Sequence, residues 1–245
     1  MGGSGFVGRH LAQELLNRGA RLRVASRQPE RAAGLKPLAN LGQVQLLRAD
    51  LTRAESLVQA LAGADAVVNL AGTFAGDLDA VMGRGAGALA QAATAAGAAV
   101  FVHISAIGAD ADGETDYAQA KAAGETAVLA AFPSATIMRP SVLFGPDDQF
   151  INMFAGLSAS LPVQPVFGST AKLQPLFVDD LALAICAALE QPAAHGGKIF
   201  ELGGPEVVTM GELNRRVAQG AGRAPLFAEL PDRSEERRVG KECCR

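Results

Sequence analysis

The sequence has few aromatic residues and no excess of positive charge. Tryptophan is absent, there is one tyrosine, and aromatic residues make up 5% of the 245 residues. Lysine and arginine number 22 against 25 aspartates and glutamates, so the formal net charge is −3. A nucleic-acid-binding protein would carry a basic surface and aromatic side chains on which bases stack. We therefore expect no nucleic-acid partner.

Cysteine and histidine are also scarce. Of the three cysteines, Cys186 lies in an apolar run, and Cys243 and Cys244 are adjacent. This arrangement matches neither a disulfide framework nor the spacing of metal ligands. The three histidines are far apart in the sequence. The sequence therefore predicts no metal site and no Ser-His-Asp triad.

One long stretch lacks charge altogether. Residues 85–109 contain no Asp, Glu, Lys or Arg, and a run of this length could be mistaken for a membrane span. Alanine and glycine dominate it, however, and Gln91, Thr94 and His103 interrupt it. We interpret it as a buried helix followed by a buried strand. No transmembrane segment is expected, and the predicted location is the cytoplasm.

Strand-like and helix-like segments alternate over the first 145 residues. Apolar strands are predicted at residues 21–27, 43–51, 65–72, 99–106 and 136–145. Helices are predicted at residues 6–19, 55–64, 87–98 and 117–132. Continuous apolar strands that alternate with helices are typical of a sheet covered on both faces. The predicted fold class is α/β, a doubly wound and mostly parallel Rossmann sheet.

The pattern loosens beyond Gly145, where Pro, Gly and Ser are frequent. We predict a Rossmann domain over residues 1–144 and a smaller C-terminal substrate lobe over residues 145–232, with elements that return to the main sheet. Residues 233–245 are abruptly charged and resemble a translated sequencing-adapter read. They are predicted to be a non-native tail and are excluded from the fold.

Gly2, Gly5 and Gly8 open the first predicted helix. Such glycines permit a tight turn, close approach of a pyrophosphate, and packing of the helix on a strand. The free N–H groups at the start of the helix favour phosphate. The turn therefore predicts a dinucleotide site. No strand precedes it in the sequence, so we expect the first, central strand of the sheet to be missing and the chain to be unstable without it.

The end of the next strand should choose the cofactor. It carries Ser26 and Arg27 in place of the acidic residue that holds the ribose of NAD. Arginine can bind the additional phosphate of NADP, although Arg27 could also be a solvated surface charge. Asp50 either faces the adenine or caps the following turn. NADP(H) is therefore favoured over NAD(H), and the predicted binding residues are Gly2, Gly5, Phe6, Val7, Gly8, Arg27, Asp50, Leu51, Ala71 and Gly72.

Tyr117 and Lys121 stand four residues apart on one predicted helix, so they share a face. A free tyrosine has a pKa of about 10, and a nearby ammonium should lower it. Tyr117 could then exchange a proton with a substrate oxygen while a nicotinamide exchanges a hydride. A chance surface pair would show the same spacing.

These motifs resemble those of a known family. GGSGFVG, NLAG, the HIS strand end, YAQAK and RPSVLFG follow the order and spacing of extended or atypical short-chain dehydrogenase/reductases. The sequence is also similar to the NAD(P)-binding accessory-subunit family of respiratory complex I and its bacterial relatives. The segments that carry this similarity are VHISAIGAD, MRPSVLFGPDDQFINMF and FELGGPEVVTMGEL. The resemblance covers almost all of residues 2–230.

The resemblance implies roles for individual residues. Tyr117 would be the acid–base residue, Lys121 would contact the nicotinamide ribose, and Pro140 would lie near the nicotinamide. Ser105 would be the active-site serine. A shift of one residue would place Ala106 there instead and leave the catalytic set incomplete.

Two functions stay open at this point. The first is an NADP-preferring oxidoreductase or epimerase acting on an unknown small molecule, which the Tyr117–Lys121 pair favours. The second is a non-catalytic nucleotide-binding accessory or assembly subunit of complex I, held at the inner membrane by its partner subunits. The sequence similarity to the complex I family favours the second, as would Ala106 at the position of the serine. Whether the chain is an enzyme is left undecided by the sequence.

Overall fold

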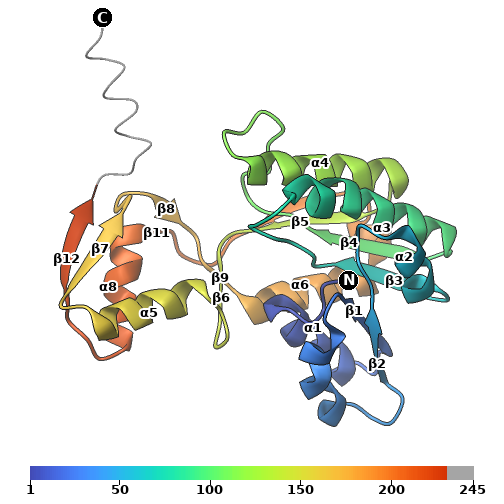
Figure 1. Ribbon diagram of the computed structural model, residues 1–245, viewed down its shortest axis with the longest axis horizontal. Coiled ribbons are helices and arrows are strands. Elements are labelled where there is room, and N and C mark those ends of the chain that lie inside the picture. The colour runs from blue at the N-terminus through green and yellow to red at the C-terminus, as the bar shows by residue number, and fades with distance from the viewer. Residues whose placement is uncertain (231–245) are drawn as a thin grey trace, which may run out of the picture. The chain divides into compact units, whose positions relative to one another are not determined.

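The computed structural model describes residues 1–230 (Figure 1), and the predicted tail at residues 233–245 lies outside them. The chain divides into two compact units. The first comprises Met1–Pro140 and Val178–Leu202, and the second comprises Ser141–Phe177 and the chain from Gly203. The predicted boundary at residue 144 lies close to the first junction, and two later helices and a strand within Val178–Leu202 rejoin the first unit.

The first unit is built from alternating strands and helices. Its strands are β1 (Leu22–Ser26), β2 (Val44–Arg48), β3 (Ala66–Asn69), β4 (Val100–Ile104), β5 (Thr136–Pro140) and β10 (Ile199–Leu202). Its α-helices are α1 (Phe6–Asn17), α2 (Ala54–Leu61), α3 (Arg84–Ala95), α4 (Asp116–Ala131), α6 (Val178–Glu190) and α7 (Pro192–His195). A 3-10 helix spans Pro29–Leu38, and a π-helical turn spans Asp79–Gly83.

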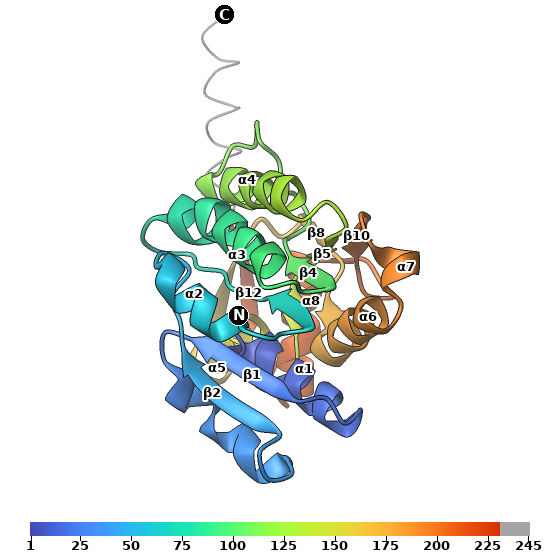
Figure 2. The same ribbon diagram turned by 90° about the vertical axis from the view of Figure 1, so that its right-hand side faces the viewer.

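All strand pairs of the first unit are parallel, in the orders β1-β2 and β10-β5-β4-β3. Helices α2, α3 and α4 cover one face of the β3–β4–β5 sheet, and α1 and α6 lie on the other (Figures 1 and 2). The predicted α/β class with a parallel, doubly wound sheet is confirmed. In such sheets ligands bind beyond the carboxyl ends of the strands.

The backbone of Met1 and Gly2 lies between β1 and β3. Gly2 N donates to Ala25 O at 2.8 Å, and Leu70 N donates to Met1 O at 2.9 Å. The α-amine of Met1 donates to Val68 O at 2.6 Å, and burial lowers its pKa to about 6. One extended chain therefore fits between β1 and β3 at this end. That a further strand belongs along the rest of this space stays a prediction.

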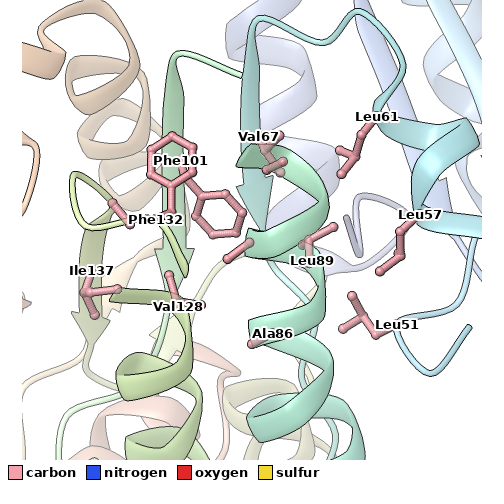
Figure 3. Close-up of a cluster of buried hydrophobic side chains, with 13 residues drawn as sticks. Leu51, Leu57, Leu61, Val67, Ala86, Leu89, Phe101, Val128, Phe132 and Ile137 are labelled. Carbon is pink, nitrogen blue, oxygen red and sulfur yellow. The ribbon is translucent and has the colours of Figure 1, made fainter. Parts of the chain in front are cut away.

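The main core lies between the sheet and the helices α2, α3 and α4 (Figure 3). Phe101 of β4 packs against Phe132 with ring centroids 5.6 Å apart, and both side chains are buried. Helices α3 and α4 approach closely because small residues face each other. A Cβ on Gly87 of α3 would lie 2.8 Å from the Cβ of Ala127 on α4, and a Cβ on Gly124 of α4 would lie 2.0 Å from Met82 O in the π-helical turn, so glycine permits the close approach at both positions. The alanine and glycine content of residues 85–109 is thereby explained, and the predicted buried helix and strand are α3 and β4.

The second unit contains two helices, α5 (Phe150–Ser160) and α8 (Met210–Gly220), and several short strands. Strand β7 (Val163–Phe167) pairs in parallel with β12 (Leu226–Leu230). The remaining pairs are β6 (Leu143–Phe144) with β9 (Leu176–Phe177), and β8 (Lys172–Leu173) with β11 (Val208–Thr209). No helix within residues 1–230 combines the length and apolar character needed to cross a membrane.

One local prediction is wrong, and one helix lies where no element was predicted. The single strand expected at residues 136–145 is broken, because β5 ends at Pro140 and the chain then enters the second unit as β6. Proline lacks the N–H that would continue the ladder. The Pro- and Gly-rich stretch after Gly145 contains α5, which follows Asp148. The Asp148 carboxylate accepts from Ile151 N at 2.5 Å and stabilises the start of that helix.

Candidate functional site

The glycine turn connects Met1 to α1 beside the end of β3. Gly2 has φ +77°, and a Cβ there would lie 2.9 Å from Ala71 N, so a side chain would be both strained and obstructed. A Cβ on Gly8 would lie 2.4 Å from Gly3 O, which makes Gly8 the residue that allows α1 to approach the turn. Helix α1 has no side-chain cap on its first N–H groups. These amides are therefore available to an anion.

A cavity of about 670 Å³ opens beside this turn. Its lining includes these predicted cofactor residues: Gly2, Gly5, Arg27, Asp50, Leu51, Ala71 and Gly72. It also includes Ser4, Ser26, Arg31, Arg48 and Thr52. The turn, the ends of β1 and β2, and the segment after β3 thus meet at the carboxyl edge of the sheet, as the sequence predicts for a dinucleotide site.

The other predicted residues lie outside the cavity lining. Phe6 and Val7 form the first turn of α1, and Gly8 packs against Gly3. Pro140 ends β5, where its carbonyl accepts from Ile107 N at 3.1 Å. Lys121 is buried on α4.

Three arginines line the cavity at the ends of β1 and β2. Arg27 follows β1, Arg48 ends β2, and Arg31 lies in the 3-10 helix between them. Ser26 lies beside them with its hydroxyl buried, and no hydrogen-bond partner for it occurs in the described chain. An orphaned hydroxyl and three guanidinium groups fit a ribose that carries a phosphate. Arg31 and Arg48 were not identified from the sequence, because neither belongs to a motif.

Asp50 caps the turn after β2, as one of the two interpretations predicted, and that it faces the adenine stays a prediction. It lines the cavity, and its Oδ1 accepts from Thr52 N at 3.0 Å and from Thr52 Oγ1 at 2.9 Å. These hydrogen bonds, aided by the charges of Arg27 and Arg53, hold the pKa of the Asp50 carboxyl below its usual value. Asp50 is therefore ionised at neutral pH and fixes the turn that follows β2.

Tyr117 and Lys121 lie on α4, whose first turn is capped by Thr115. Lys121 is 4% exposed, and its ammonium donates to Ile104 O at 3.1 Å. The same ammonium lies 5.7 Å from the centroid of the Tyr117 ring. A Cβ on Gly72 would lie 3.7 Å from Lys121 Nζ, so Lys121 also reaches the segment that lines the cavity.

Burial dominates the electrostatics of this pair. It lowers the pKa of Lys121 to about 8, although the Glu125 carboxylate opposes the shift. It raises the pKa of Tyr117 above its ordinary value, so the predicted net lowering is wrong for this structure, because burial outweighs the charge of Lys121. Desolvation disfavours the charged form of each group. At neutral pH Lys121 is therefore mostly an ammonium and Tyr117 keeps its proton.

Ser105 follows β4, next to the residue whose carbonyl binds Lys121. It is 3% exposed, its N–H donates to Met138 O at 2.7 Å, and its hydroxyl has no hydrogen-bond partner in the described chain. A buried hydroxyl without a partner is a candidate donor for a ligand. This supports Ser105 over Ala106, which offers no polar side-chain atom.

A buried polar pair links the cavity wall to Lys121. Asn69 and His103 are paired in register on β3 and β4, with Asn69 Nδ2 3.1 Å from His103 Nδ1. Asn69 Oδ1 accepts from Ala71 N at 3.2 Å, so Nδ2 is the donor to the histidine. Burial and the Lys121 charge lower the pKa of His103 to about 3, which keeps it neutral. A polar residue interrupting each of two neighbouring apolar strands was the signal that sequence reasoning missed.

Comparison with known proteins agrees with this geometry. The sequence profile described as the NAD dependent epimerase/dehydratase family matches residues 1–203. The chain belongs to this family. The resemblance drawn from the motifs is thereby confirmed, and so is its dinucleotide-binding character.

Among individual relatives, the chain is 36% identical over 240 residues to the mitochondrial NADH dehydrogenase [ubiquinone] 1 alpha subcomplex subunit 9 of Arabidopsis thaliana, covering 94% of this chain and 59% of that protein. It is 33% identical over 237 residues to the ceramide reductase of Caulobacter vibrioides, covering 94% of this chain and 72% of that protein. It spans 59% and 62% of the Arabidopsis and Dictyostelium discoideum subunits.

A similar solved structure is the dTDP-glucose 4,6-dehydratase DesIV of Streptomyces venezuelae with NAD bound. The TM-score is 0.83 at 20% identity, over 95% of this chain and 84% of that one. At this identity the likeness shows the fold alone.

Proposed function

We propose that the chain binds NADP(H) in preference to NAD(H) and reduces a carbonyl group. The observation that carries the cofactor preference is the set of three arginines at the ends of β1 and β2, beside the buried Ser26 hydroxyl. Charge-assisted hydrogen bonds are worth about 1.5–3 kcal/mol each. One of them to a ribose phosphate would favour NADPH by about tenfold to about 150-fold.

The glycine turn supports the same proposal. Gly2 and Gly5 would leave room for a pyrophosphate beside the start of α1, whose uncapped N–H groups would donate to it. Along the other wall, Ala71 carries only a methyl group and Gly72 has no side chain, so both leave room for a ligand. Asn69 holds Ala71 in place through its side-chain oxygen.

Bound NADP(H) would supply the hydride. Tyr117 would supply the proton, because its raised pKa keeps its hydroxyl protonated at neutral pH. Lys121, with a pKa of about 8, would still be cationic there and would stabilise the phenolate left behind. Ser105 would donate a hydrogen bond to the substrate oxygen. Hydride at the carbonyl carbon and a proton at its oxygen together give an alcohol.

A second function is favoured by a separate observation. Several relatives are named as complex I subunits, and the Arabidopsis subunit is 36% identical over 94% of this chain. Subunits of this kind could use a bound dinucleotide for stability alone. The raised pKa of Tyr117 is compatible with that role, since a protonated and buried tyrosine need not react.

Tyr117→Phe distinguishes the two functions. It removes the proton donor and keeps the ring, so reduction of carbonyl substrates by NADPH should fall by at least ~100-fold while NADPH affinity stays unchanged. Oxidation of NADPH measures the first and calorimetry the second. Absence of turnover in the unaltered protein, together with co-purification of complex I subunits, would support the accessory role and overturn the reductase.

A further inference from the structure

An exposed aromatic ring lies on the proposed proton donor. Phe74 is 88% exposed, yet its ring is stacked on that of Tyr117, with centroids 4.9 Å apart and planes 16° from parallel. The ring face directed away from Tyr117 is therefore open. Leaving a phenylalanine this exposed forgoes the stabilisation that burial of its ring would give.

The turn after β3 fixes Phe74 in this position. Thr73 Oγ1 donates to Ala75 O at 2.9 Å and accepts from Ala75 N at 3.2 Å, which closes a tight turn around Phe74. Gly76 follows with φ +80°, a conformation that favours glycine. Asp77 then caps the next turn by accepting from Ala80 N at 2.9 Å. The hydrogen bonds of Thr73 and Asp77 therefore hold the backbone around Phe74 in the conformation in which its ring stacks on Tyr117.

A second apolar side chain lies at the same edge of the sheet. Ile107 follows β4, the neighbour of β3, and is 45% exposed. Its N–H donates to Pro140 O, which fixes it beyond β5 as well. Phe74 therefore follows the carboxyl end of β3, and Ile107 and Tyr117 follow that of β4, at the edge of the sheet where ligands of this fold bind.

The segment leading into α4 is acidic. It carries Asp110, Asp112, Glu114 and Asp116, and it folds back on the helix because Asp110 N donates to Ala118 O at 3.2 Å. Gln119 Nε2 donates to Gly113 O at 2.8 Å and holds the same loop. Negative charge within about a Debye length of Tyr117 disfavours an anionic substrate.

We propose that Phe74 is the specificity-determining residue of the carbonyl site and selects an uncharged substrate with an apolar group that stacks on its open face. This rests on the proposed reductase function, because it names the substrate class of that same site. The apolar group covers Phe74 while the carbonyl oxygen meets the Tyr117 hydroxyl. An anionic substrate is repelled by the loop before α4.

Binding tests this without turnover. Tyr117 is the only tyrosine and tryptophan is absent, so the near-ultraviolet absorbance change of tyrosine reports this site alone. The probes are a long-chain methyl ketone and the keto acid of the same chain length. The unaltered protein should bind the ketone at least about tenfold more tightly than the keto acid.

Phe74→Ala should weaken binding of the ketone about tenfold or more, since it removes most of the apolar surface that the substrate covers. Phe74→Leu, which keeps an apolar side chain, should recover most of that loss. Leu41→Ala removes another fully exposed apolar side chain, before β2 at the opposite edge of the sheet, and should change nothing. Circular dichroism checks that each variant folds.

Three results would overturn the inference: no ketone binding by the unaltered protein, equal affinity for ketone and keto acid, or unchanged ketone affinity in Phe74→Ala. Failure of the reductase proposal would look different. If ketone binding depends on Phe74 but no carbonyl is reduced, the reductase function fails and the binding site stands. If ketones are reduced with the same KM in Phe74→Ala, the reductase stands and the role of Phe74 fails.

Discussion

Replacing Lys121 with methionine should change how Tyr117 titrates. The ammonium lies 5.7 Å from the centroid of the tyrosine ring. At an effective dielectric constant of about 20, two unit charges about 6 Å apart interact by about 3 kcal/mol, equivalent to about a hundredfold in an ionisation constant. Burial raises the pKa of Tyr117, whereas the pKa of Lys121 is lowered to about 8. The two groups should therefore titrate as a coupled pair.

This coupling determines whether Lys121→Met moves tyrosinate formation to higher or to lower pH. Between about pH 8 and 10 the pair loses the first of its two protons. In part of the molecules this proton leaves Tyr117, because the charge that then remains on Lys121 stabilises the phenolate. Some tyrosinate should therefore form in this range in the unaltered protein. In Lys121→Met no ammonium is present, so all of the tyrosinate should form at higher pH. Methionine fits the buried position because its length is similar and it needs no hydrogen-bond partner.

The assay is the absorbance of tyrosinate against pH, which here reports one residue because the chain has a single tyrosine and no tryptophan. Lys198→Met serves as the control, since Lys198 is exposed at the start of β10 and should leave the curve unchanged. Superimposable titration curves for the unaltered protein and Lys121→Met would refute the coupling, and with it the role of Lys121 in stabilising the phenolate.

Three further predictions concern stability. An apolar strand of about five residues added before Met1 should pair with β1 and β3 and replace the buried α-amine. It should raise Tm by about 5–10 °C relative to a Gly/Ser extension of equal length; equal Tm values would contradict this. In the protein without the added strand, the α-amine of Met1 has a pKa of about 6 when folded, below its value in the unfolded chain. The folded state therefore binds fewer protons than the unfolded chain, so the free energy of unfolding should rise between about pH 6 and 8. Gly124→Ala should destabilise the fold by about 1–3 kcal/mol in urea unfolding, whereas the exposed Gly156→Ala should not.

The sequence was sufficient for the parallel sheet, since each strand of the first unit is an apolar run between helices. It was also sufficient for the glycine turn, where Gly2 and Gly8 meet backbone atoms that would clash with a Cβ. Spacing put Tyr117 and Lys121 on one face of α4. These features are local, and local pattern determines them.

Features that depend on tertiary placement were not predicted. Arg31 and Arg48 reach the cavity only because a 3-10 helix and the end of β2 meet Arg27 there. Nothing in the sequence around Phe74 indicates that its ring stacks on that of Tyr117. The direction of the Tyr117 pKa depends on how far burial outweighs a neighbouring charge, and spacing along a helix carries no information on burial.

The second unit was described least well from the sequence. Its strands β6, β8, β9 and β11 span two residues each, too short for a period of two to be visible. Helix α8, by contrast, spans 11 residues, long enough for a helical pattern to be visible in the sequence. The network of Ser158, Gln164 and Asn214 that joins α5, β7 and α8 involves residues far apart in the chain, and no sequence pattern indicates it.

Dinucleotide affinity tests the central claim most directly. Calorimetric titration of the protein with NADPH and with NADH should show NADPH bound at least about tenfold more tightly, and Arg27→Ala should remove most of that preference. Arg21→Ala, an exposed arginine just before β1 at the opposite end of the strand, should preserve it. Equal affinities for the two dinucleotides, or a preference unchanged in Arg27→Ala, would contradict the assignment of this cavity to NADP(H).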